Sequence, residues 1–287
     1  MKHNRILITG AASGLGKALA LCWAKHASQS NVEAKICVAD IHDERGAETL
    51  DALKALGASA MYCHCDITAS DDIARVRQQL IEEWGGVDVI INNAGVATGG
   101  SLASEPMSQW KWIFDINLFG MVQICQQFVG DFKRQGRGQI INIASQAGIT
   151  PIPLMSSYNA VKGAVVSFSE TLRLELAHDN INVSVVCPSF FKTNLDESMR
   201  STEASSKQII HKLFEKADMT AAQVAEVIYQ QAAKNKFLII THKQGRIAYL
   251  MKKLLPLDTY LKRVIKATTG VVQRSKKANA EVEQTNV

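Results

Sequence analysis

Residues 9–16 of the chain read TGAASGLG, between a short β-branched run and a segment of helical period that begins LGKALA. Glycines at 10, 14 and 16 let the chain turn tightly, let the backbone approach a pyrophosphate, and let helix and strand pack closely. The N–H groups at the start of the helix are free to bind an anion. The stretch predicts a dinucleotide-binding turn, and a plain structural turn is the alternative. The predicted contacts come from Thr9, Gly10, Ser13, Gly14, Leu15 and Gly16.

Apolar β-branched runs alternate with longer helical segments along residues 1–241. This alternation is typical of βαβ units and predicts an α/β doubly wound (Rossmann) fold with a seven-stranded parallel sheet and helices on both faces. The predicted strands are Arg5–Thr9, Lys35–Ala39, Ala60–Cys63, Val87–Ile91, Gln139–Ile143, Asn182–Val186 and Phe237–Ile240. The predicted helices lie near 14–27, 43–56, 70–84, 107–134, 157–178 and 220–234.

The composition, with 47% hydrophobic and 21% charged residues in 287, is that of a soluble globular protein. No apolar run is long enough to span a bilayer and no signal-peptide pattern opens the chain, so we expect a cytoplasmic protein. The six cysteines are spread over the predicted core elements and are interpreted as reduced thiols. The Cys63-His64-Cys65 run lacks a second ligand pair at zinc spacing, so we interpret its cysteines as buried apolar side chains and predict no metal.

Asp40 closes the second predicted strand, 24 residues beyond Gly16. An acidic side chain near this interval accepts hydrogen bonds from the adenosine ribose hydroxyls and repels a 2′-phosphate. Ser13 and Ile41 supply no cation for such a phosphate, so the sequence predicts NAD, with NADP less favoured. The alternative is that Asp40 caps the helix that starts at Asp43.

Polar residues also follow the next two predicted strands. Asp66 ends the third, and Asn92-Asn93-Ala94-Gly95 ends the fourth. Ligands of parallel sheets gather outside the carboxyl ends of the strands, so Asp66, Asn93 and Gly95 are predicted to share one crevice with the glycine turn.

Ser145 follows the fifth predicted strand, and Tyr158 and Lys162 lie four residues apart on a predicted helix. This spacing puts the phenol and the ammonium on one helical face. A phenol with a pKa near 10 is a poor base, and a neighbouring cation, together with the positive charge of an oxidised nicotinamide, lowers its pKa toward neutrality. The pattern favours proton transfer by Tyr158. Taken singly, Ser145 is also compatible with a turn and Lys162 with a solvated helix face.

These motifs, in register over residues 4–240, resemble the short-chain dehydrogenase/reductase superfamily in its single-domain branch. The resemblance implies that Tyr158 is the acid/base, that Ser145 orients the substrate oxygen, and that Lys162 binds the nicotinamide ribose and tunes Tyr158. It implies further that Asn117 holds a water of a proton relay. Taken on its own, an asparagine at this position is more often a satisfied interior amide than part of a relay.

The same resemblance assigns the remaining cofactor contacts. Asp66 and the Ile67 backbone would meet the adenine, while Thr193 and the backbone from Pro188 to Phe191 would fix the carboxamide. The chain departs from the common pattern at Ser189, where many members have glycine. The details of the nicotinamide contacts are therefore less secure than the catalytic residues.

The substrate pocket is predicted along residues 146–155 and the polar insertion Asp196–Lys207. Apolar side chains dominate residues 146–155, so we expect an apolar secondary alcohol or ketone, although the same residues are also compatible with simple loop packing. The alternatives are an NADP-dependent 3-ketoacyl-type reductase and a catalytically silent cofactor-sensing protein. Aromatic residues are sparse in the basic tail, so no nucleic acid partner is expected.

Residues 242–287 hold ten Lys or Arg and three Asp or Glu, a net charge of +7. Apolar residues recur there at helical spacing, and Pro256 should divide the segment into two helices before a disordered end at Ser275–Val287. Packing on the domain or on a second subunit is favoured over peripheral contact with an anionic membrane. The resemblance also implies a homodimer or homotetramer that pairs the helices near 107–134 and 157–178.

Overall fold

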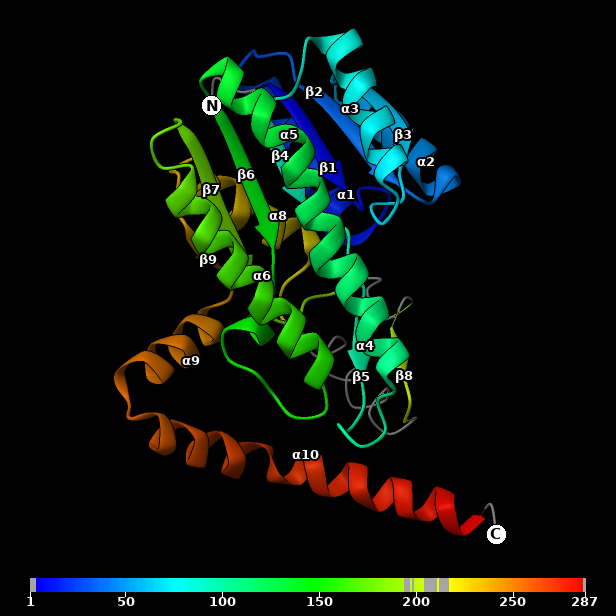
Figure 1. Ribbon diagram of the computed structural model, residues 1–287, viewed down its shortest axis with the longest axis vertical. Helices are drawn as coiled ribbons and strands as arrows, with labels where there is room; N and C mark the ends of the chain where they lie inside the picture. Colours follow the sequence, from blue (N-terminus) through cyan, green and yellow to red (C-terminus); the bar gives the residue numbers. More distant parts are fainter. Residues whose placement is uncertain (1–3, 194–196, 198, 204–210, 212–216, 286–287) are drawn as a thin grey trace.

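Figure 1 shows the computed structural model, which describes residues 4–193, 197, 199–203, 211 and 217–285, with side chains to residue 275. Seven parallel strands form one sheet in the order β3-β2-β1-β4-β6-β7-β9. The strands are β1 (Arg5–Thr9), β2 (Lys35–Asp40), β3 (Ser59–His64), β4 (Val89–Asn92), β6 (Gly138–Ile143), β7 (Ile181–Cys187) and β9 (Leu238–Ile240). The direction of winding reverses between β1 and β4, which is the crevice where such sheets bind ligands. The predicted doubly wound fold is confirmed.

Helices cover both faces of this sheet. They are α1 (Gly14–Gln29), α2 (Asp43–Ala55), α3 (Ser70–Trp84), α4 (Met107–Phe114), α5 (Met121–Gln135), α6 (Ser156–Glu175) and α8 (Ala221–Ala232). Successive residues of β1 point to opposite faces. Ile6 and Ile8 therefore pack against α1 and α8, with Leu19 among their partners, while Leu7 packs in the core formed by α3, α5 and α6, with Phe128.

The predicted helix over 107–134 is present as one unbroken helical run, 107–135, in which a π-helical segment, η1 (Asp115–Gly120), joins α4 to α5. Such a segment holds an extra residue per turn, which the apolar periodicity does not reveal. At its end Gly120 packs so tightly on Ile67 that a Cβ would come within 2.7 Å of Ile67 Cδ1.

A two-stranded parallel sheet lies beyond the main one, formed by β5 (Thr98–Gly99) and β8 (Arg200–Ser201). Next to it the buried Glu203 carboxylate accepts hydrogen bonds from Ser101 and Ser104. Half of the predicted insertion Asp196–Lys207 lies outside the described residues, which include 197 and 199–203 of it.

The tail forms α9 (Lys243–Leu254) and α10 (Leu257–Thr285), so the predicted break at Pro256 is confirmed. Figure 1 shows α10 crossing below the domain, and Ser275 Oγ of this helix donates to Glu203 Oε2 at 3.4 Å. The helix continues past Ser275, where the sequence predicted disorder. Residues 275–285 contain neither Gly nor Pro and include Ala, Lys and Glu, which favour helix. No helix in the described part of the chain is long and apolar enough to cross a membrane.

Candidate active site

A cavity of about 1080 Å³ opens at the carboxyl ends of β1, β2, β4 and β6. Fifteen of the predicted site residues line it, namely Gly10, Ser13, Gly14, Leu15, Asp40, Asp66, Ile67, Asn93, Gly95, Ser145, Tyr158, Lys162, Pro188, Phe191 and Thr193. The other three, Thr9, Gly16 and Asn117, are buried behind its wall. The fold thus brings together residues that are up to 183 positions apart in the chain.

The glycine turn is held in shape by its neighbours. Gly10 and Gly14 have φ of 64° and 52°, the left-handed region that favours glycine. A Cβ on Gly16 would come within 2.0 Å of the Gly10 carbonyl oxygen. The Asn93 amide donates to that oxygen at 3.0 Å, and Thr9 Oγ1 accepts from the Asn93 N–H at 3.1 Å. Thr9 and Gly16 therefore shape the turn from behind the cavity wall.

Asp40 lies at the opening of the turn and is 8% exposed. Its Oδ2 accepts from the Ala12 N–H at 2.9 Å, and its Oδ1 accepts from the His42 N–H at 3.1 Å. The alternative that Asp40 caps the next helix is wrong, because the residue at the N-cap of α2 is His42. Each carboxylate oxygen retains a lone pair for a further donor.

Arg45 and Glu197 also line this end of the cavity, and the sequence reasoning missed both. Two guanidinium nitrogens of Arg45 donate to Glu197 Oε2, each at 3.1 Å. Arg45 lies in α2 and not at the end of a strand, where the sequence reasoning looked for site residues. Only working out which residues of the helix from Asp43 onward share a face with the cavity would have identified it. A cation does therefore lie near Asp40, paired with a carboxylate.

Asp66 and Thr193, for which the resemblance implies contacts with the adenine and the carboxamide, both line the cavity. Asp66 Oδ1 accepts from the N–H and the hydroxyl of Thr68, at 2.8 and 2.7 Å. Thr193 lies over the glycine turn, since a Cβ on Gly14 would come within 2.8 Å of Thr193 Oγ1. The adenine contact of Asp66 and the carboxamide contact of Thr193 stay predictions.

Tyr158 and Lys162 occupy the first turns of α6, on one face as their spacing predicted. Lys162 Nζ lies 5.9 Å from the centre of the Tyr158 ring and donates to the Ile143 carbonyl at 3.1 Å. Ser145 starts the short 3₁₀ helix η2 (Gln146–Gly148), and its Oγ accepts from the Ala147 N–H at 3.2 Å. All three side chains meet at the wall of the cavity.

Burial controls the titration of this pair. It raises the pKa of Tyr158, and a hydrogen bond with the Ser145 side chain opposes that rise. Burial also lowers the pKa of Lys162 to about 8. Desolvation of the phenolate is the largest influence on the Tyr158 pKa, and the Lys162 ammonium bonds to Ile143. The predicted lowering of that pKa depends also on the positive charge of an oxidised nicotinamide and stays a prediction.

Asn117 is fully buried in η1, and its amide is paired on both sides. Its Oδ1 accepts from the Val96 N–H and its Nδ2 donates to the Val96 carbonyl, both at 2.8 Å. A Cβ on Gly95 would lie 2.9 Å from Asn117 Oδ1 and 3.6 Å from Lys162 Nζ, so the three residues are close neighbours. The structure thus shows a satisfied interior amide beside Lys162, and the water relay stays a prediction.

The loop that carries Ser189 is supported by the tail. The Ser189 N–H donates to Nδ1 of the buried His242 at 3.3 Å, and the Gln146 N–H donates to the Pro188 carbonyl at 2.7 Å. Burial lowers the pKa of His242, which favours the neutral ring, and Thr241 Oγ1 also lies 2.7 Å from Nδ1. Nothing in the sequence signalled this contact, because it depends on where α9 begins.

The far end of the cavity is apolar. Val96, Trp112, Ile152, Met155 and Phe190 line it. Among the described lining residues, the only Lys and Arg are Lys162 and Arg45. The guanidinium of Arg200 stacks on the Trp112 ring at 3.8 Å, and Arg200 is not one of the lining residues. The predicted absence of a cation gripping the substrate therefore holds for the described wall.

Comparisons with known proteins agree with this geometry. A family model for short chain dehydrogenases matches residues 4–204. A ketoacyl reductase from a Nostoc species is 33% identical over 252 residues, which are 87% of this chain and 82% of that protein. A short-chain dehydrogenase/reductase from Burkholderia phymatum in complex with NAD matches with a TM-score of 0.79 and 28% identity, over 88% of this chain and 95% of that one.

A second solved structure, a short-chain dehydrogenase from Sphingobium yanoikuyae in complex with NADPH, has a TM-score of 0.71 and 22% identity and covers 86% of this chain and 91% of that one. It shares the fold. With the family match over residues 4–204 and the cavity just described, these similarities identify the chain as a member of the short-chain dehydrogenase family, an oxidoreductase with a nicotinamide cofactor that acts on CH–OH or keto groups.

Proposed function

We propose that this protein interconverts an apolar secondary alcohol and its ketone with NAD(H), with Tyr158 as the acid/base. The observation that carries the proposal is the placement of Ser145, Tyr158 and Lys162 between a polar coenzyme groove and an apolar recess of the same cavity. A substrate in the recess meets the phenol on one side and the nicotinamide position on the other.

Each polar side chain has a separate task. When bound, the nicotinamide donates or accepts the hydride. Tyr158 gives its phenolic proton to the carbonyl oxygen during reduction and takes it back during oxidation. The Ser145 hydroxyl accepts from the Ala147 N–H and is hydrogen-bonded to Tyr158, which places it beside the phenol to orient the reacting oxygen. Lys162 uses one N–H on Ile143, which leaves two donors for the ribose hydroxyls.

The cofactor preference rests on Asp40. Its carboxylate is fixed at the adenosine end by two backbone N–H groups, where it accepts from ribose hydroxyls and repels a 2′-phosphate. Arg45, the cation nearby, is neutralised by Glu197. Comparing kcat/KM for NAD and NADP tests this directly, and a preference for NADP of about tenfold or more contradicts the assignment.

A 3-ketoacyl substrate is the second candidate, favoured by the similarity to the Nostoc ketoacyl reductase. The apolar recess suits an acyl chain as well as a simple ketone. A panel of ketones of increasing apolar size and of 3-ketoacyl thioesters, each with NADH and with NADPH, separates the two. Turnover of thioesters alone, with NADPH, would replace the first proposal with the second.

We infer further that the tail docks the enzyme on an anionic membrane surface. Six large apolar residues of α9 and α10 are exposed at helical spacing, namely Ile247, Leu250, Leu254, Leu257, Leu261 and Ile265. These six side chains therefore do not pack on the domain, whereas the predicted contact with a second subunit stays a prediction. Residues 243–266 also hold seven Lys or Arg and one Asp, a net charge of +6.

Charge favours a membrane over a second copy of the chain. A two-fold interface through this stripe would bring two surfaces of the same positive sign together, whereas anionic headgroups attract them. The tail is tied to the substrate end of the cavity, because Lys252 donates to the Ile149 carbonyl at 2.7 Å and Gln146 donates to the Gly245 carbonyl at 3.2 Å. Docking would thus place the apolar recess close to the bilayer.

Sedimentation with vesicles tests the docking surface. We expect the full chain to sediment with phosphatidylglycerol vesicles, much less with phosphatidylcholine, and less again at high salt. The double variant Leu254→Ser/Leu261→Ser should stay in solution. If wild type and variant sediment alike, or if the variant changes the oligomeric mass instead, the membrane assignment is wrong. The predicted homodimer or homotetramer is measured in the same ultracentrifuge runs.

A further inference from the structure

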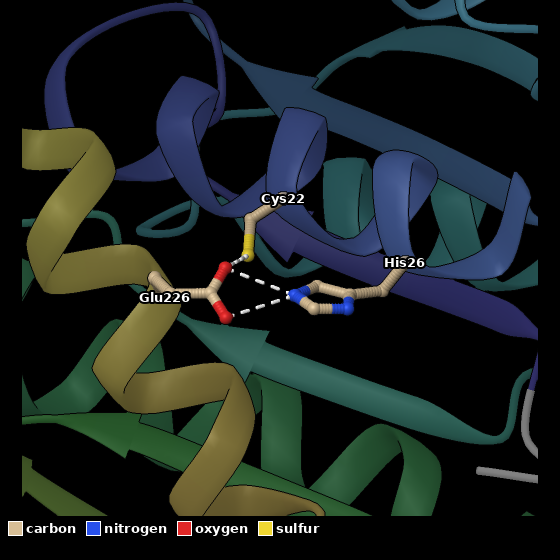
Figure 2. A group of neighbouring side chains, drawn as sticks. All are labelled: Cys22, His26 and Glu226. Atoms are coloured by element: carbon tan, nitrogen blue, oxygen red, sulfur yellow. Dashed lines mark hydrogen bonds and ion pairs between the residues drawn. The ribbon is translucent and has the colours of Figure 1, made fainter. Parts of the chain in front are cut away.

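Three potential metal ligands meet between α1 and α8, on the sheet face opposite α5 and α6. Figure 2 shows Cys22 and His26, which come from one helix, pointing at the carboxylate of Glu226 on the other. The His26 Nε2 atom lies 2.9 and 3.1 Å from the two carboxylate oxygens, and Cys22 Sγ lies 3.6 Å from Oε2. One ligand atom from each residue lies within 4.8 Å of the others.

The geometry points to a zinc site formed by Cys22, His26 and Glu226. The spacing of four puts the thiol and the imidazole on one helical face, the arrangement that helices use for pairs of zinc ligands. Zinc at bond lengths of about 2.0–2.3 Å holds tetrahedral ligand atoms about 3.3–3.6 Å apart. The observed separations reach this range with small movements of side chains.

The donor set selects the kind of ion. Thiolate, imidazole and carboxylate together suit zinc, whereas calcium and magnesium prefer oxygen ligands alone. Binding breaks the S–H bond of Cys22, the proton leaves to water, and the sulfur bonds to the metal. The side chains of His26 and Glu226 are 25% and 40% exposed, so an ion can enter from solvent and keep a water as fourth ligand.

Neighbouring side chains hold two of the ligands in place. The His26 ring stacks on Tyr229 at 3.9 Å between centroids with an interplanar angle of 6°. The Gln230 amide donates to Glu226 Oε1 at 2.7 Å. Such supporting contacts are typical of metal sites, because they fix the orientation of a ligand before the ion binds.

A bound ion would fasten α1 to α8. The start of α1 carries Gly14 and Gly16 of the glycine turn, so the metal would brace the coenzyme end from the outside of the fold. Catalysis needs no such ion, since the three ligands are not among the residues that line the cavity. The proposal is therefore independent of the cofactor and substrate assignments.

Cobalt binding to the full, untagged chain tests the site. We expect one Co²⁺ per chain, with a thiolate-to-cobalt charge-transfer band and the intense visible bands of tetrahedral cobalt, and displacement of both by zinc. Cys22→Ser should remove the charge-transfer band. His26→Gln and Glu226→Gln should each weaken binding at least about 100-fold, beyond the roughly 10- to 100-fold that loss of a supporting contact gives.

His64→Gln is the matched control, since His64 is an exposed histidine bonded to the Asp43 carboxylate at 2.8 Å. It should bind cobalt as wild type does. Zinc should also raise the Tm of the wild type and of His64→Gln but not of Cys22→Ser. Absence of the thiolate band, its persistence in Cys22→Ser, or wild-type affinity in His26→Gln and Glu226→Gln would show that the trio is a hydrogen-bonded cluster only.

Discussion

The two ends of the cavity are built in different ways. At the coenzyme end, backbone and side chains bond to each other: Asn93 holds the Gly10 carbonyl, and Asp40 accepts from two backbone N–H groups. At the substrate end, the wall consists of apolar side chains such as Trp112, Ile152 and Met155. The coenzyme end, which binds the same ligand in every turnover, is thus held rigid by hydrogen bonds. The substrate end would recognise its ligand by shape and by apolar contact. The boundary between them is Tyr158 with Lys162.

The largest expected effect is at this boundary. Tyr158→Phe removes the proton donor and should lower kcat by about 100- to 10,000-fold, while NAD affinity, measured by nucleotide fluorescence, changes little because the groove is intact. Turnover close to wild type in Tyr158→Phe would show that another group moves the proton.

Lys162→Met should stabilise the folded chain at neutral pH. Burial lowers the pKa of Lys162 to about 8 from 10.5, so below pH 8 the fold carries the full cost of a buried ammonium, about 3 kcal/mol. Loss of the bond to Ile143 offsets about 1 kcal/mol of the gain.

The pH dependence has a definite sign. Between pH 8 and 10.5 the unfolded lysine holds a proton that the folded one has lost, so wild-type stability rises with pH across this window. The advantage of Lys162→Met in urea unfolding should therefore shrink from pH 7 to pH 10. A constant difference over that range would mean that Lys162 is not charged and buried in the fold.

Asp40→Asn should weaken the preference for NAD over NADP. Removing the negative charge relieves repulsion of a 2′-phosphate, so we expect the NAD-to-NADP ratio of kcat/KM to fall at least about tenfold, or roughly 1.4 kcal/mol. Glu197→Gln, which releases Arg45 without touching Asp40, should move the ratio the same way by less, because the ion pair is exposed. An unchanged ratio in both variants contradicts the role of Asp40.

The smallest effect is expected in the recess. Ile152→Val removes one methylene from its wall and should lower kcat/KM for a large apolar ketone by about fourfold, at about 0.8 kcal/mol per buried methylene. Ile41→Val, the same change at the coenzyme end, should leave kcat/KM for that ketone unaltered. If both variants respond alike, the substrate does not occupy the recess.

The alternation of strands and helices was readable because each buried strand must be apolar and each crossover must have helical period. The π turn that holds Asn117 was not readable, since its extra residue leaves no mark in the apolar periodicity. Arg45 was also missed, because it reaches the cavity only through the way α2 is rotated about its axis when it packs on the sheet.

The sequence by itself determined the parallel sheet, the glycine turn, Asp40 and the Ser145, Tyr158 and Lys162 set, because a strand end or a spacing of four fixes where such side chains point. Only the tertiary structure decided the rest. It paired Arg45 with Glu197 and left the leucines of the tail in solvent. It also brought Glu226 to Cys22 and His26 across 200 residues, since contacts between elements depend on how helices pack on a sheet.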